Sequence, residues 1–333
     1  MIIAGGVLLF FCSQAELVLV VLLASIMLAF ILAPVADFFE RWRLPRSLAS
    51  AIAVFSLLGA LVAASYFSYS EASAFARNLP RYSAKMRSQI AQWRDSRSPQ
   101  PSEVRAAPQA ASGSSMVAVD TSNWLELARH GFGSLYEALI AASFMPFLIY
   151  FMLSWHRHIR SATVMLFRMP HRHTAYVTLG LIARMMRIFL VGNFLIGVLI
   201  SLVSIGIFAT LGLPFFYFVG PISGFLSLVP YLGIVLALVP PVVVGISQMD
   251  SGALIFLVAA VLALHVISLN LLYPKFLGTR LQLNPLTVTI SLLFWGWLWG
   301  AMGLLLAIPL TAATKIVFDH VEGLRPYGAW LGE

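Results

Sequence analysis

The sequence predicts an all-α, polytopic membrane protein, on the basis of its composition and its pattern of apolar runs. Of its 333 residues, 60% are apolar and 10% are charged, whereas soluble domains usually carry about 25% charged residues. A run of about 20 apolar residues suffices to cross the hydrocarbon core of a bilayer. The runs lack the ten-residue alternation of a barrel, so they are expected to be helices. They are residues 16–38, 48–70, 138–155, 188–212, 215–247, 252–273 and 285–314.

Residues 1–70 are expected to form the first membrane helices. Residues 1–12 are apolar but lack a basic n-region and a small-residue cleavage site, so we interpret them as an anchor or half-span, not a signal peptide. Counted with the seven runs, they give about seven or eight membrane helices. The single cysteine, Cys12, leaves no disulfide framework and no cysteine metal site. We therefore expect no metal and no cofactor.

The basic residues predict the orientation of these helices. The net charge is +8, but the arginines flank membrane spans, so the bilayer is the expected partner and nucleic acid is not. Residues 156–187 contain six arginines, four histidines and no acid, which predicts a basic cytoplasmic loop. Within it, residues 174–190 have the mixed pattern of an interfacial helix. The cluster Arg41, Arg43 and Arg46 should lie on the same side.

Residues 71–137 are expected to form an external helical segment. The span at 48–70 leads out from the Arg41 cluster and the span at 138–155 returns to the basic loop, so the intervening segment lies outside. Its middle, residues 96–115, is rich in Ser, Pro, Ala and Gln, which is typical of a flexible strip.

Two apolar elements in the expected transport core, residues 188–318, contain repeated helix breakers. Residues 215–247 are too long for one straight span and contain four prolines, and residues 285–314 are interrupted by three glycines and a proline. Their second halves are similar, G-I-V-L-A-L-V-P from Gly233 and G-L-L-L-A-I-P from Gly303. The chain is expected to leave the membrane's outer face before residue 215 and to reach a basic cytoplasmic stretch after the span 252–273. Residues 215–247 must therefore enter the membrane and return on the outer side, as a hairpin or re-entrant element. Paired broken elements indicate a secondary transporter's binding site, although glycines also simply permit close helix packing.

Few polar groups lie within the apolar runs, and these are the candidates for function. Asn193 and Asn270 could bind a solute's hydroxyl groups or bond helix to helix. His265 could carry a proton, or be a neutral histidine bonded to a neighbouring helix. Trp295, Trp297 and Trp299 favour an interfacial belt over an aromatic gate. The expected substrate-binding residues are Asn193, Pro230, Tyr231, Gly233, Asn270, Gly300, Gly303 and Pro309.

Enzymatic motifs are missing from the sequence. There is no G-x-G-x-x-G, P-loop or H-E-x-x-H pattern, so no catalytic residues are assigned. Without a P-loop the chain is not expected to be an ATP-driven pump by itself.

Five short motifs give the chain a family resemblance. They are Gly192-Asn193, F-L-S-L-V-P-Y-L-G (225–233), L-L-Y-P-K-F-L-G (271–278), L-N-P-L (283–286) and G-L-L-L-A-I-P-L-T-A (303–312). Together they resemble the autoinducer-2 exporter family. The resemblance implies about eight membrane helices in the bacterial inner membrane, an external helical segment and transport without ATP. It also implies a homo-oligomer, with a pentamer as the expected form.

The chain departs from the family pattern at three positions. Asn193 stands where the family has glutamine, and His265 and Asn270 stand where many relatives carry polar Gln and Glu. Loss of the acid argues against acid-based ion coupling. The leading hypothesis is therefore a secondary transporter that exports a small polar solute, such as autoinducer-2. A cation/proton antiporter and a non-transporting membrane scaffold are the alternatives. Residues 319–333 are expected to be a C-terminal tail.

Overall fold

The computed structural model describes residues 15–66, 69, 77, 135–229, 232–246, 248–277 and 283–332. Every regular element in these ranges is a helix, which confirms the all-α class. The predicted anchor at 1–12 and nearly all of the external segment at 71–137, including the strip at 96–115, lie outside the described residues.

Five of the described helices are long and apolar enough to cross a membrane. They are Leu17–Arg41, Arg46–Tyr66, Met169–Thr210, Ser251–Phe276 and Pro285–His320. The chain is thus a multi-pass membrane protein, and the count of seven or eight helices stays a prediction.

The first helices pack through small side chains. Helix α2 (Glu16–Arg41) is followed by the helix Arg46–Tyr66, and α5 (Leu135–Met165) contains the predicted span 138–155. The buried alanines Ala29, Ala36 and Ala53 form one cluster with Ile149 and Leu153. Small residues let helix backbones approach closely, which supplies packing energy in the absence of a hydrophobic driving force.

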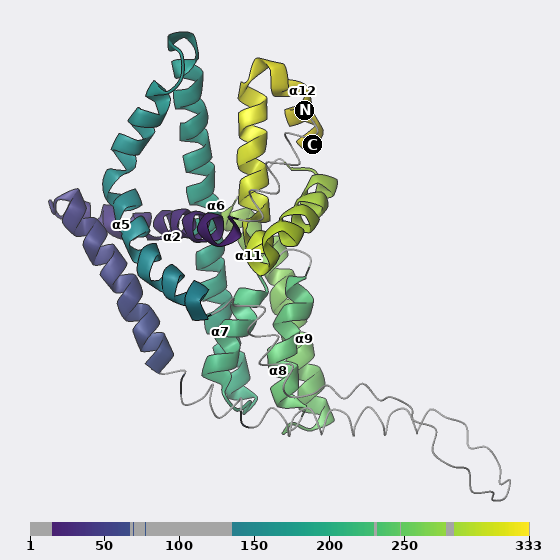
Figure 1. The fold of residues 1–333 in the computed structure, drawn as a ribbon. Coiled ribbons are helices and arrows are strands. Elements are labelled where there is room, and N and C mark those ends of the chain that lie inside the picture. The colour runs from purple at the N-terminus through teal and green to yellow at the C-terminus, as the bar shows by residue number, and fades with distance from the viewer. Residues whose placement is uncertain are drawn as a thin grey trace, which may run out of the picture.

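The basic segment 156–187 is mostly helical in the structure. α5 continues to Met165, and α6 (Arg172–Thr210) is one helix of 39 residues, about 58 Å long at the standard rise. A short turn with the 3₁₀ helix η1 (Met169–His171) joins them. Arg168 before it is extended (φ −61°, ψ 148°), and Pro170 lies in the first turn of η1, where its missing N–H would have had no helical partner. Figure 1 shows α5 and α6 diverging from this turn, with α2 crossing between them.

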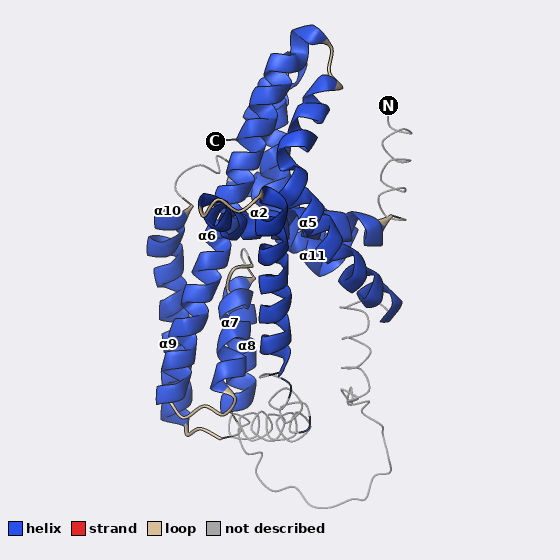
Figure 2. Ribbon diagram, turned by 90° about the vertical axis from the view of Figure 1, so that its left-hand side faces the viewer, coloured by secondary structure: helices blue, strands red, loops and turns tan. Residues whose placement is uncertain are grey.

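The next three helices form the opposite end of the molecule (Figures 1 and 2). They are α7 (Phe216–Leu226), α8 (Gly233–Gly245) and α9 (Ser251–Ile267). Together with the end of α6 they bury Phe208, Val219, Ala237, Val244 and Leu257. α9 begins where the Asp250 carboxylate accepts hydrogen bonds from the backbone N–H groups of residues 252 and 253, a standard N-cap.

The C-terminal part contains two irregular helical segments. After α9, a π-helical turn, η2 (Ser268–Leu272), leads into α10 (Tyr273–Phe276). α11 (Pro285–His320) is sharply bent, and in Figure 1 its bend points down toward α7, α8 and α9. η3 (Glu322–Leu324) and α12 (Arg325–Leu331) complete the chain. The Asn284 side chain caps α11 at Thr287 N and donates to the Trp330 carbonyl at 2.9 Å, which holds α12 against the start of α11.

Candidate functional site

α7 lies against α6 through glycines that leave no room for side chains. A Cβ on Gly224 would lie 2.7 Å from the backbone nitrogen of Ser201, and one on Gly220 would lie 3.0 Å from that of Ile205. Further along, a Cβ on Gly197 would meet the Leu228 side chain at 2.8 Å. The two helices are therefore antiparallel, and the end of α7 lies level with Gly197 of α6.

α7 and α8 form the first hairpin. The Ser223 hydroxyl donates to the Ala237 carbonyl at 2.7 Å, and both residues are buried. Gly233, the first residue of α8, packs against the backbone carbonyl of Ser227. The two arms of 215–247 are therefore packed against each other, while the entry and return of this element on one side of the membrane stay a prediction. Pro230 and Tyr231, which are predicted to line the site, lie outside the described residues.

α11 forms the second hairpin. The helix breaks at Trp299 (φ −134°, ψ 23°) and Gly300 (φ 55°, ψ −135°), and the latter conformation is accessible in practice only to glycine. Gly303, just after the break, packs against the backbone carbonyl of Trp295. The sequence predicts that 285–314 is broken by three glycines and a proline, and the break is confirmed at one of these glycines, Gly300.

A buried hydrogen-bonded chain joins the two arms of α11. Trp295 Nε1 donates to Thr311 Oγ1 at 3.2 Å, and Thr311 Oγ1 donates to Ser291 Oγ at 2.8 Å. The ring centroids of Trp295 and Trp299 lie 5.0 Å apart, and the two rings are tilted relative to each other. Of the three tryptophans, only Trp297 is strongly exposed. Sequence reasoning missed Ser291 and Thr311, because hydroxyl residues in a helix commonly bond to their own backbone. Only the fold-back brings residues 20 positions apart into contact.

The sequence similarity of the two broken elements corresponds to a structural one. Gly233 and Gly303 each stand near the start of a second arm, and each lies against a carbonyl of the first arm. Both glycines therefore permit close packing. The alternative, a solute site between the two broken elements, stays a prediction.

The two hairpins contact the same stretch of α6. Phe189, Leu190, Ile196 and Ile200 form a buried cluster that also contacts Leu228, at the end of the first hairpin's first arm, and Ile308, on the second arm of α11, among its neighbours. Asn193 lies within this stretch. Its Oδ1 is buried and has no hydrogen-bond partner among the described residues, which is costly in an apolar environment.

α9 and η2 contribute further unpartnered polar atoms near this cluster. The Nδ1 atom of His265 and the hydroxyl of Ser268 are buried without hydrogen-bond partners in the described part of the chain. Leu264 and Leu272, which flank them along the chain, contact the α6 cluster that surrounds Asn193. Ser268 begins the π-helical turn, a feature found often at functional sites, and no sequence pattern predicts it.

The remaining predicted residues are placed as follows. The exposed Asn270 side chain donates to the Val266 carbonyl of its own helix at 2.8 Å, and a Cβ on Gly300 would meet open space at the bend. Pro309 is fully buried. The structure therefore brings the regions of Asn193, His265 and Pro309 together on α6, but it does not direct Asn270 toward them.

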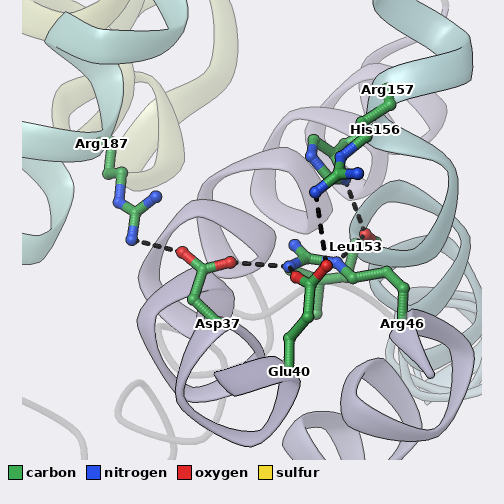
Figure 3. Close-up of polar contacts among 7 residues, drawn as sticks. All are labelled: Asp37, Glu40, Arg46, Leu153, His156, Arg157 and Arg187. Carbon is green, nitrogen blue, oxygen red and sulfur yellow. Dashed lines mark hydrogen bonds and ion pairs between the residues drawn. The ribbon is translucent and has the colours of Figure 1, made fainter. Parts of the chain in front are cut away.

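An ion-pair network occupies the basic end of the helices (Figure 3). The Asp37 carboxylate pairs with Arg46 at 2.7 Å and with Arg187 at 2.6 Å. Glu40 pairs with Arg46 and also with Arg157, the latter at 3.3 Å. Arg46 donates through Nε to the Leu153 carbonyl at 3.1 Å. The network confirms that Arg46 and the basic segment 156–187 lie at the same end of the molecule.

Known proteins resemble this chain along most of its length. The AI-2E family transporter model matches residues 1–323. The AI-2 transport protein TqsA of Escherichia coli is 25% identical over 309 residues, which cover 93% of this chain and 87% of TqsA. Matches to a Haemophilus influenzae protein and to YhhT of Escherichia coli, both 36% identical, span about a third of each relative's length, 32% and 31%. Since the family model covers nearly the whole chain, this protein belongs to the AI-2E family of transporters.

Proposed function

We propose that this protein is a secondary transporter of the bacterial inner membrane that exports a small polar solute, with autoinducer-2 or a related metabolite as the expected cargo. TqsA, named as an AI-2 transport protein, matches 93% of the chain. The chain's own sequence has no nucleotide-binding loop, so the driving force would be a gradient. Family resemblance also supports assembly as a homo-oligomer.

The meeting of two helical hairpins on one stretch of α6 is the observation that carries this proposal. Leu228 and Ile308 bring the two hairpins to the residues that flank Asn193. A buried amide oxygen without a partner at that place can accept a hydrogen bond from a solute hydroxyl. Irregular backbone at membrane depth is tolerated only where protein or a water-filled cavity satisfies it, so the bend of α11 at Trp299 and Gly300 suits the lining of a solute path.

The direct test is flux through purified protein in proteoliposomes. Vesicles loaded with labelled autoinducer-2 should lose it faster than protein-free vesicles, and an unlabelled polyol should compete. The Gly59→Leu variant is a matched control, because a Cβ at Gly59 meets nothing within 4 Å. If no solute gradient changes while the protein remains folded, export is contradicted.

Cation/proton antiport is a second candidate because of His265. An ionisable side chain inside a membrane helix is a functional candidate by default, and its Nδ1 has no partner in the described part of the chain. The titratable groups on the following α10 are Tyr273 and Lys275, and the described residues place no carboxylate beside His265.

If His265 carries the proton, His265→Gln should abolish the pH dependence of transport while expression stays normal. A fluorescent pH reporter inside the vesicles measures this under sodium and potassium gradients. Reduced expression or stability instead would assign His265 a structural role. Unchanged pH dependence together with normal expression would remove it from the mechanism.

A further inference from the structure

A cavity of about 680 Å³ lies between α2, the helix Arg46–Tyr66, α5 and α6. It is distinct from the stretch of α6 where the hairpins meet. Figure 1 shows its setting, where α5 and α6 separate from their shared turn and α2 crosses between them. The arginines among its lining residues place the cavity beside the ion-pair network of Asp37, Arg46 and Arg187.

The cavity carries more positive charge than its own acid can neutralise. Four arginines and one carboxylate, that of Asp37, line it. Arg46 and Arg187 both pair with Asp37. Arg160 and Arg184 pair with no carboxylate among the described residues. Two guanidinium groups are thus left for an anion from outside the chain.

The Arg160 guanidinium is held in place by its neighbours, but one of its N–H donors has no acceptor among the described residues. Its guanidinium carbon lies 4.1 Å from the centroid of the Tyr176 ring, and Nη2 donates to the Tyr176 carbonyl at 3.2 Å. A Cβ on Gly180 would meet the same Nη2 at 2.6 Å, so the group bridges from α5 to α6. Its Nε is buried and has no hydrogen-bond partner in the described residues. An acceptor oxygen in the cavity would satisfy this donor.

Apart from His156 and Thr163, the rest of the wall is apolar. Ile26 and Phe30 of α2, Met152 of α5, and Leu179 and Ile182 of α6 line the cavity. A small soluble anion would leave this surface in contact with water, whereas a hydrocarbon chain would cover it. Ile159, one of the apolar lining residues, is 47% exposed, so the apolar part of the wall reaches the protein surface.

We propose that this cavity binds an anionic phospholipid. Arg160 and Arg184 hold the headgroup phosphate, and one acyl chain lies along Ile26, Phe30 and Ile182. Basic pockets between membrane helices at the headgroup level are suited to such lipids. Arg184 is on the same continuous helix as Asn193, so lipid occupancy would bear on the helix that carries the candidate site. The lipid assignment itself does not depend on the identity of the cargo.

Native mass spectrometry of the purified full-length protein tests this assignment. Phosphatidylglycerol added to the detergent-solubilised protein should be retained in preference to phosphatidylcholine. Arg184→Gln should lower phosphatidylglycerol retention about fivefold, because each basic side chain near an anionic lipid surface contributes on that scale. Arg168→Gln is the matched control, since Arg168 belongs to the same acid-free segment and does not line the cavity.

A second pair of variants tests the apolar wall without changing charge. Ala183→Trp places a ring in the cavity and should displace the lipid, whereas Ala162→Trp, on the exposed outer side of α5, should not. Equal retention of both lipids, or equal loss in Arg168→Gln, would overturn the assignment. Displacement of phosphatidylglycerol by inorganic phosphate alone would also overturn it, in favour of a soluble anion. So would a cross-link between copies through a cysteine at Thr163, which would show that a second chain fills the cavity.

Discussion

At the scale of single residues, Asn193 is the polar group whose surroundings favour function most. Its Oδ1 is buried without a partner among the described residues, whereas Asn270 already bonds to the carbonyl of Val266 and is exposed. The two asparagines are equivalent in the sequence, because each is an amide within an apolar run. Only the rotation of each helix against its neighbours distinguishes them.

Asn193→Ala is expected to reduce solute flux up to about tenfold, the effect of losing one neutral hydrogen bond to the solute. Asn193→Gln, which keeps the amide on a side chain one methylene longer, should retain most of the flux. Initial rates in proteoliposomes, normalised to inserted protein, measure both variants. Asn270→Ala is the comparison and should transport nearly normally. A greater loss of flux in Asn270→Ala than in Asn193→Ala would place the site at the exposed side of η2 instead.

Gly303 lies in contact with the backbone of the other arm of α11, so substitution there should disturb the packing of the two arms. A side chain at this position would collide with the Trp295 carbonyl, so Gly303→Leu must separate the two arms of α11. Overpacking of this kind costs about 1–3 kcal/mol, and we expect transport to be lost while the protein still inserts. Gly59→Leu should do neither, since its Cβ meets open space. Thermal unfolding in detergent, measured beside flux, checks both variants, and normal flux in Gly303→Leu would contradict the expectation.

At the scale of elements, contacts between the two arms of the bent α11 indicate that it is a rigid unit. Its arms are joined by the Ser291, Thr311 and Trp295 side chains and by the contact of Gly303 with a carbonyl. Opening the arms would leave these buried polar groups unpaired, and each such group costs about 1–3 kcal/mol. The hairpin is therefore expected to move as a whole against α6, if it moves at all.

A disulfide between cysteines at Ser291 and Thr311 tests this rigidity. Their hydroxyl oxygens are 2.8 Å apart, so the sulfur atoms can reach bonding distance with a small adjustment. In a Cys12→Ser background, which removes the only native cysteine, the bridge should form readily and leave flux unchanged. Inactivation that a reductant reverses would instead show that the arms separate during transport. The oxidised Cys12→Ser protein is the control.

At the scale of the whole molecule, the sequence predicted the features that depend on local composition. Apolar runs predicted α2 and α9, because the length and polarity of a segment decide whether it crosses a bilayer. The repeated glycines and prolines predicted that 285–314 is broken. They did not single out Trp299–Gly300, because glycine is tolerated within a packed helix, as Gly296 and Gly303 are, and only tertiary contacts decide where the chain turns.

Features that depend on distant contacts could not be predicted in this way. Asp37 and Arg187 form an ion pair although 150 positions separate them, and their sequence neighbourhoods contain no sign of that pairing. The segment 156–187 is predicted to be a basic loop, apart from an interfacial helix over 174–190 that lies within α6. Arginine is a good helix former, however, so the helical arms continue until the turn at Pro170.

The orientation of the molecule is the prediction that involves all of its helices. The acid-free segment 156–187 is expected in the cytoplasm, and the pairing of Glu40 with both Arg46 and Arg157 places two basic clusters at that same end. A cysteine at Thr163, on α5, should therefore react with an impermeant maleimide only after cells are permeabilised. A cysteine at Ser112, which lies outside the described residues, should react in intact cells. Both substitutions are made in the Cys12→Ser background, so that any label reports the new position. Labelling at 163 in intact cells would reverse the orientation.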